Sequence, residues 1–175
     1  MIKIGILGDI GSGKSYVAQN FGYPVFNADY EVTKLYQQNK NIFNKLKIKL
    51  PKHIHSFPIE KTEVSNAILA NKNNLKKIVK IVHTEIRKKL VNFLKKNKNK
   101  NKKIVILDIP LLLENKINNK KDILVFVQSK KSTILKNLKK KKNFNKKLLK
   151  KFKSIQLPLS YKKKKSHFII KNNFT

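Results

Sequence analysis

The stretch Gly8-Asp9-Ile10-Gly11-Ser12-Gly13-Lys14-Ser15 decides the fold of this chain. It matches the pattern G-x-x-x-x-G-K-[ST], in which a glycine-rich loop between a strand and a helix holds phosphate groups. Its backbone N–H groups are expected to point at phosphate oxygens, toward which the following helix directs its positive end. A glycine-rich turn without a nucleotide is the plain alternative. The apolar run from Ile2 to Leu7 and the helical pattern from Tyr16 to Phe21 favour phosphate binding.

This loop predicts ATP as a ligand and Mg²⁺ as the metal ion bound together with it. Lys14 is expected to reach the β- and γ-phosphates and to act in catalysis, and Ser15 is expected to bind Mg²⁺. Asp108 ends a second apolar run and supplies the other expected Mg²⁺ ligand, although Asp is also common at turns and caps. The predicted nucleotide-binding residues are Gly8, Gly11, Ser12, Gly13, Lys14, Ser15 and Tyr16.

Three residues outside the loop suit an acceptor site. Asp29 follows a short predicted strand, where its carboxylate is placed to take a proton from an acceptor hydroxyl. An N-cap of a helix starting near Tyr30 explains Asp29 equally well. His83 and Arg87 are four residues apart and share a helix face, which suits an anionic ligand. A surface ion pair with Glu85 or another acid is the alternative for Arg87.

The order of apolar runs predicts an α/β fold. Short runs without alternation are typical of buried parallel strands, and helical patterns separate them. We therefore predict a three-layer P-loop NTPase or kinase sandwich with a parallel sheet. Residues 1–30 and 103–175 form its nucleotide-binding core, and residues 31–102 form a helical acceptor-binding insertion. The predicted strands are Ile2 to Leu7, Pro24 to Asn27, Ile104 to Leu107, Ile123 to Val127 and Phe168 to Ile170; the insertion's helices include Lys61 to Ala70, Asn73 to Val82 and Thr84 to Leu94.

Two lysine-rich tracts interrupt these patterns. The tract Lys95 to Lys103 is low in complexity and is predicted to be a solvated connector. The run Lys139 to Lys142 precedes a helix expected near Asn145, and it suits a mobile lid over residues 136–146 or a solvated helix.

The composition limits which binding partners and which cellular location are expected. The chain has 175 residues, no cysteine and a formal net charge of +33. Lysine is spread over nearly every helix without interleaved aromatic residues, which disfavours a specific nucleic-acid site. No signal peptide or membrane span is recognisable, so a cytoplasmic protein is expected, with a monomer favoured. Arg87 is the only arginine among 42 basic residues, and only nine acids are present.

With these elements in order, the chain resembles the dephospho-coenzyme A kinase family over nearly its whole length. The family's patterns I-G-L-T-G-G-I-G-S-G-K-S, D-A-D, I-V-H-P-x-V-R, D-x-P-L-L-F-E and V-I-x-N correspond here to Ile4 to Ser15, Asn27 to Asp29, Ile81 to Arg87, Asp108 to Glu114 and Ile169 to Asn172, and a family glutamine falls on Gln156.

The resemblance implies transfer of the ATP γ-phosphoryl group to the ribose 3'-hydroxyl of the small-molecule substrate dephospho-coenzyme A. Asp29 is then the carboxylate that orients or deprotonates this hydroxyl, and His83 and Arg87 belong to the acceptor site. The lysines that would replace the family's lid arginines are Lys136, Lys139 or Lys140.

Several departures from the family pattern bear on activity. Asp9 and Asn27 stand where the family has a glycine and an acid, and Tyr16 and Thr84 are also unusual. The family's further helix after the last strand is not seen before Thr175, from which low stability is expected. Another small-molecule kinase, a nucleic-acid-associated P-loop protein and a kinase that binds without turnover are the alternatives.

Overall fold

The computed structural model describes residues 1–140 and 144–174, which fall into two compact units. The first unit comprises Met1–Asn27, Phe93–Phe144 and Ile155–Thr175. The second comprises Ala28–Asn92 and Asn145–Ser154. The second unit therefore takes in a short segment from the C-terminal half of the chain, besides the interval in which the sequence predicts a helical insertion.

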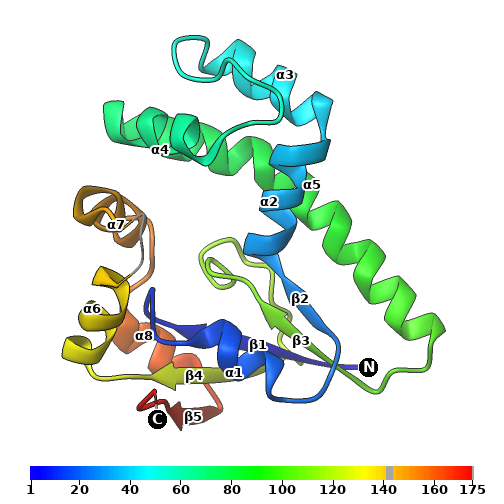
Figure 1. Ribbon diagram of the computed structural model, residues 1–175. Helices are drawn as coiled ribbons and strands as arrows, with labels where there is room; N and C mark the ends of the chain where they lie inside the picture. The colour runs from blue at the N-terminus through cyan, green and yellow to red at the C-terminus, as the bar shows by residue number, and fades with distance from the viewer. Residues whose placement is uncertain (141–143, 175) are drawn as a thin grey trace. The chain divides into compact units, whose positions relative to one another are not determined.

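A parallel sheet of five strands, in the order β2-β3-β1-β4-β5, forms the centre of the first unit (Figure 1). Helices cover both of its faces, so the predicted three-layer α/β sandwich is confirmed. All five predicted strands are present: β1 (Ile2–Gly8), β2 (Val25–Asn27), β3 (Ile104–Asp108), β4 (Ile123–Gln128) and β5 (Phe168–Lys171). The helices of this unit are α1 (Lys14–Gln19), α6 (Lys131–Lys139) and α8 (Leu159–Lys165).

Alternation along β1 explains how the sheet is covered. Ile4 and Ile6 face the same side and pack with Ala18 of α1, which is fully buried. Gly5 faces the other side, where a Cβ atom would lie 2.5 Å from a side-chain carbon of Leu112. This close packing on both faces fixes the strand that leads into the phosphate loop.

The second unit is helical. It contains α2 (Ala28–Gln38), α3 (Lys40–Lys49), α4 (Lys61–Ala70), α7 (Lys146–Lys153) and most of α5 (Lys72–Asn99). Buried apolar residues recur every three or four positions along α5, which is the pattern of a helix packed along one face. They are Leu75, Ile78, Val82, Ile86 and Leu90.

A lysine joins α7 to α4 within this unit. The Lys151 ammonium group donates hydrogen bonds to the carbonyl oxygens of Ile68 and Leu69 at 2.6 and 3.0 Å. These carbonyls belong to the last turn of α4, where the helix presents unpaired acceptors and partial negative charge. The contact holds residues 145–154 to the helical unit.

The structure corrects three helix boundaries. The two helices predicted over 73–82 and 84–94 are one continuous helix, α5, because nothing between them breaks the backbone and Thr84 is not a proline. The helix predicted from Tyr16 begins at Lys14, inside the phosphate-loop motif. The helix predicted near Tyr30 begins at Ala28, so Asp29 lies in its first turn and the N-cap interpretation is wrong.

The prediction of a solvated connector from Lys95 is also wrong for its first residues. Helix α5 continues through it to Asn99, since lysine is a good helix former. The buried Asn97 donates its side-chain amide to the carbonyl of Phe93 at 2.9 Å, and the Phe93 ring lies 5.5 Å from that of Phe26. The ring contact holds this end of the helix to β2 within the first unit, and the Asn97 amide closes a bond inside the helix. Only the residues after Asn99 form a connector.

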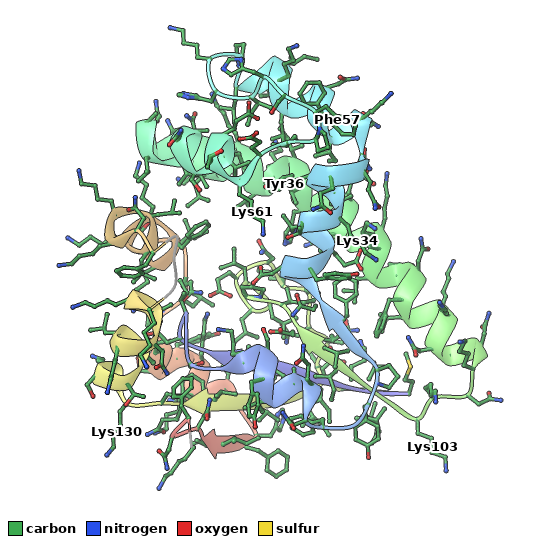
Figure 2. All side chains as sticks on the ribbon, in the orientation of Figure 1. Lys34, Tyr36, Phe57, Lys61, Lys103 and Lys130 are labelled. Atoms are coloured by element: carbon green, nitrogen blue, oxygen red, sulfur yellow. The ribbon has the colours of Figure 1, made fainter. Side chains whose placement is uncertain are left out.

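The high positive charge lies largely on exposed side chains. Lys103 and Lys130 are exposed and extend away from the ribbon (Figure 2). No helix among residues 1–140 and 144–174 is long and apolar enough to span a bilayer.

Candidate active site

Asp108 lies at the centre of the candidate active site of the first unit. Parallel pairing of β2 with β3 sets Asn27 opposite Asp108, at the carboxyl ends of both strands. One carboxylate oxygen, Oδ2, accepts hydrogen bonds from the Ser15 hydroxyl at 2.6 Å and from the Asn27 amide at 2.8 Å. The structure thus brings together Ser15 and Asp108, which lie 93 residues apart in the sequence.

These two oxygens are suited to Mg²⁺. Mg²⁺ prefers oxygen ligands and is commonly bound through one or two protein groups together with substrate phosphates and water. No group of three or more His, Cys, Asp or Glu side chains that could hold a metal occurs in the described part of the chain. The Ser15 hydroxyl and the Asp108 carboxylate therefore fit an ion shared with a bound nucleotide, and they do not form a closed protein site.

Lys14 turns its ammonium group toward the loop. Its Nζ donates to the carbonyl oxygens of Asp9 and Gly8 at 2.7 and 3.3 Å. These bonds hold the amine beside the glycine-rich loop, a position from which Lys14 would contact the β- and γ-phosphates.

The loop backbone depends on glycine at two positions. Gly11 and Gly13 have φ angles of 84° and 87°, a region that residues with side chains rarely adopt. Gly13 is also the N-cap of α1, so the first N–H groups of this helix follow the loop directly. This arrangement is typical of an anion site at a helix N-terminus.

Asp9 is the unusual residue of the loop. It is 7% exposed, and its Oδ1 accepts a hydrogen bond from the backbone N–H of Ile10 at 2.7 Å. The carboxylate is therefore turned into the protein, and it engages an N–H group of the loop itself. A negative charge so close to the cradle opposes a polyphosphate ligand, so we expect Asp9 to weaken nucleotide binding.

The predicted acceptor residues belong to the second unit. Asp29 is exposed in the first turn of α2, two residues after Asn27. His83 and Arg87 lie one turn apart on α5, where His83 is half-buried and Arg87 is exposed. Glu85 pairs with Lys88 at 2.9 Å on the same helix.

The environment of His83 keeps its imidazole neutral. Burial lowers the pKa of His83 from its ordinary value of 6.5, and the nearby Arg87 charge lowers the pKa further. At neutral pH this side chain is therefore a hydrogen-bonding group, while the positive charge of the pair resides on Arg87.

The predicted lid residues are only partly within the described structure. Lys136 and Lys139 are exposed in the last turn of α6, and Lys140 is its C-cap. Residues 141–143 of the predicted lid lie outside the described residues. Helix α7 begins at Lys146 with Asn145 as its N-cap, as the sequence predicts.

Sequence patterns did not predict two groups of side-chain contacts. The side chains of Ser129 and Asn172 contact the phosphate loop, and only the terminal motif Ile169 to Asn172 draws attention to Asn172 in the sequence. Glu114 and Lys162 form a buried ion pair. The scarcity of acids draws attention to Glu114, whereas Lys162 stands in a run of four lysines and is marked only by its position three residues after Leu159 in α8.

These features define a class of protein. A phosphate loop between the first strand and the first helix of a parallel sheet, with a strand-end acid bonded to the loop's serine, is the arrangement of P-loop kinases. A model of the family described as dephospho-CoA kinase matches residues 2–175. The chain belongs to the dephospho-CoA kinase family.

Individual relatives agree with this assignment. A dephospho-CoA kinase of Wolbachia sp. subsp. Brugia malayi (strain TRS) is 39% identical over 114 residues, which cover 63% of this chain and 58% of that relative. A dephospho-CoA kinase of Bartonella henselae is 33% identical, with the same two shares covered. The matches thus span less than two thirds of these relatives' length.

Solved structures show the same fold. A Thermus thermophilus protein superimposes with a TM-score of 0.77 at 25% identity, covering 98% of this chain and 88% of the other. A dephospho-CoA kinase from Campylobacter jejuni superimposes with a TM-score of 0.61 at 22% identity over the same shares.

Proposed function

We propose that this chain transfers the γ-phosphoryl group of ATP to the ribose 3'-hydroxyl of dephospho-coenzyme A and so produces coenzyme A. The contact of 2.6 Å between Ser15 and Asp108 carries this proposal, because it brings together two oxygen groups that would hold Mg²⁺ in a member of the dephospho-CoA kinase family. Family membership implies ATP as the donor, and the acceptor is the further step proposed here.

On the donor side, Lys14 and the loop N–H groups hold the phosphates. Ser15 and Asp108 are the residues that would hold Mg²⁺. When bound, Mg²⁺ neutralises charge that develops on the phosphate oxygens. The acceptor oxygen forms a bond to the γ-phosphorus while the bond from that phosphorus to the β–γ bridging oxygen breaks, and ADP leaves.

On the acceptor side, the Asp29 carboxylate takes the proton that the 3'-hydroxyl loses. Arg87 binds a phosphate of the acceptor through its planar guanidinium group, and the neutral His83 donates or accepts one hydrogen bond to the same ligand. Lys136, Lys139 and Lys140 contribute positive charge over the donor phosphates as a lid. We further propose that the protein acts as a monomer in the cytoplasm.

A coupled assay of ADP formation tests the proposal. Dephospho-coenzyme A is compared with nucleosides, nucleoside monophosphates and shikimate at equal concentrations of Mg-ATP. We expect turnover to be selective for dephospho-coenzyme A, whereas selective turnover of a nucleoside monophosphate would overturn the acceptor assignment. Binding to DNA that persists at physiological salt would favour the nucleic-acid alternative.

Arg87→Lys should raise the KM for the acceptor by about tenfold, because lysine retains the charge and loses the bidentate hydrogen bonds. We expect kcat to change little. Steady-state kinetics with varied dephospho-coenzyme A measure this, and Lys88→Arg, one position along α5, is the control for altered basic groups. An unaltered KM would show that Arg87 does not bind the acceptor.

The lowered pKa of His83 predicts a pH dependence of stability. The unfolded chain binds a proton at this residue near pH 6.5, and the folded chain binds it only at lower pH. Well above pH 6.5, His83 is neutral in both states and should not affect the free energy of unfolding. As pH falls through 6.5 and below, the unfolded chain binds the proton more tightly, so the free energy of unfolding should fall. Urea unfolding from about pH 8 to about pH 5 should show a shallower decline for His83→Gln than for the parent. His55→Gln, at an exposed site in the same unit, is the control, and identical slopes for the parent and His83→Gln would contradict the prediction.

A further inference from the structure

One carbonyl group of the phosphate loop is held by two side chains from elsewhere in the first unit. The backbone oxygen of Ser12 accepts a hydrogen bond from the Ser129 hydroxyl at 2.9 Å and another from the Asn172 amide at 3.0 Å. Ser129 follows the end of β4, and Asn172 follows the end of β5. The carboxyl ends of two neighbouring strands thus act together on one atom of the loop.

The orientation of the Asn172 amide is determined by its neighbours. Its Oδ1 accepts the backbone N–H of Phe174 at 3.1 Å, so Nδ2 is the atom directed at the Ser12 carbonyl. The backbone of Asn172 is also tied to the sheet, because its N–H donates to the carbonyl of Gln128 at 2.9 Å. Asn172 therefore brings a donor to the loop from a fixed support.

The geometry of the peptide between Ser12 and Gly13 links this contact to the N–H groups of the phosphate loop. The carbonyl of Ser12 and the N–H of Gly13 belong to the same planar trans peptide and point in opposite directions. Holding the carbonyl toward Ser129 and Asn172 directs the Gly13 N–H to the opposite side. Gly13 has no side chain, and a Cβ atom there would collide with the Asn172 amide.

We propose that Ser129 and Asn172 are positioning residues that aim the N–H of Gly13 at a phosphate of the nucleotide. The inference rests on the proposed function only for nucleotide binding and is independent of the acceptor. Without these two donors the Ser12–Gly13 peptide loses the bonds that fix the direction of its carbonyl, and the loop loses a preorganised N–H donor.

The test measures equilibrium binding of ADP and of tripolyphosphate to the full chain, without acceptor. Ser129→Ala and Asn172→Ala should each weaken binding of both ligands by about three- to tenfold, the range expected for one hydrogen bond. The double variant should bind them more weakly still. In turnover, the KM for ATP should rise, while the KM for dephospho-coenzyme A stays at the parent value.

The variant Asn172→Asp provides a readout that a purely structural role would not produce. It keeps the acceptor for Phe174 and sets a carboxylate oxygen against the Ser12 carbonyl, so binding should be weak at neutral pH. As pH falls and the new carboxyl group gains a proton, it can donate again and binding should recover. Asn173→Asp places the same charge on the exposed neighbouring residue and should show neither effect.

Three results would overturn the proposal. They are parent-like binding in the double variant, weakening of ADP binding with tripolyphosphate binding unchanged, and equal behaviour of Asn172→Asp and Asn173→Asp. The second would indicate a contact with the base or ribose. Thermal unfolding of each variant shows whether it is folded, and an unfolded double variant leaves the single variants and the pH recovery to decide. The equilibrium-binding measurements that decide these three results contain no acceptor, so failure of the acceptor assignment would leave them unaffected.

Discussion

Asp29→Asn should lower kcat by about 10²- to 10⁴-fold, the usual contribution of a positioned acid or base, while the dissociation constant of ATP stays at the parent value. The amide retains the size of the side chain and cannot accept the proton of the 3'-hydroxyl. Asp29 belongs to α2 and contributes no atom to the loop between β1 and α1, so donor binding should be preserved. Single-turnover kinetics with saturating Mg-ATP and dephospho-coenzyme A measure the chemical step.

Glu31→Gln is a matched control for this experiment. Glu31 lies in the same first turn of α2 and pairs with Lys89 at 2.9 Å. Both substitutions remove a negative charge that favours the N-terminal end of the helix, and this effect is worth about 0.3–1 kcal/mol at an exposed position. If Asp29 served only the helix, the two variants would lose similar stability and neither would lose turnover. Parent-like turnover of Asp29→Asn would therefore contradict its assignment as the base.

The sheet and the donor side of the site were predictable because their signals are local. Each buried strand is a short apolar run, and the glycine-rich motif specifies its own backbone geometry. The partnership of Ser15 with Asp108 also followed, since parallel strands place their carboxyl ends at one edge of a sheet.

The boundaries of α5 were less predictable because tertiary contacts determine them. Lysine and asparagine in the tract after Leu94 suggest a solvated connector, yet each lysine is also a good helix former. The buried amide of Asn97 and the contact between Phe93 and Phe26 decide in favour of helix. The contact of Phe93 with Phe26 cannot be read from composition, because Phe26 lies on the distant strand β2.

The side chains that contact the phosphate loop, and the buried lysine, could also not be predicted from sequence patterns alone. Ser129 and Asn172 lie 117 and 160 residues from Ser12. They reach the Ser12 carbonyl only because the fold brings the ends of β4 and β5 to the phosphate loop. Lys162 is 1% exposed although it stands among four consecutive lysines. In a chain with this much lysine, the buried lysine is identified by its partner rather than by its type.

The ion pair of Glu114 with Lys162 should have the largest effect on stability. The two side chains are 9% and 1% exposed, and Lys162 Nζ lies 2.6 Å from Glu114 Oε1. The same oxygen accepts the backbone N–H of Leu157 at 2.9 Å, while Glu114 Oε2 is buried and has no partner among the described residues. Glu114 thus joins the segment after β3 to the segment before α8 through one atom.

Glu114→Ala should lower the free energy of unfolding by about 3–5 kcal/mol, because it leaves the Lys162 charge buried without a counter-charge. Lys162→Met should lose less, since Glu114 keeps its bond from Leu157 and methionine fills much of the lysine's volume. Urea unfolding followed by circular dichroism measures these changes, with the urea midpoint and slope compared among variants. Glu85→Gln is the control, because it breaks a pair of similar geometry in which Lys88 is 66% exposed, and such exposed pairs contribute about 0–1 kcal/mol.

The double variant Glu114→Gln with Lys162→Met separates charge from packing. The glutamine keeps an acceptor for the Leu157 N–H, and removal of both charges eliminates the cost of burying them. We therefore expect the double variant to be more stable than Glu114→Ala, with a loss smaller than the sum of the single losses of Glu114→Gln and Lys162→Met. Additive losses would show that the two side chains act independently. A loss in Glu114→Ala no larger than that of Glu85→Gln would show that water reaches Lys162 and that the pair is not buried in solution.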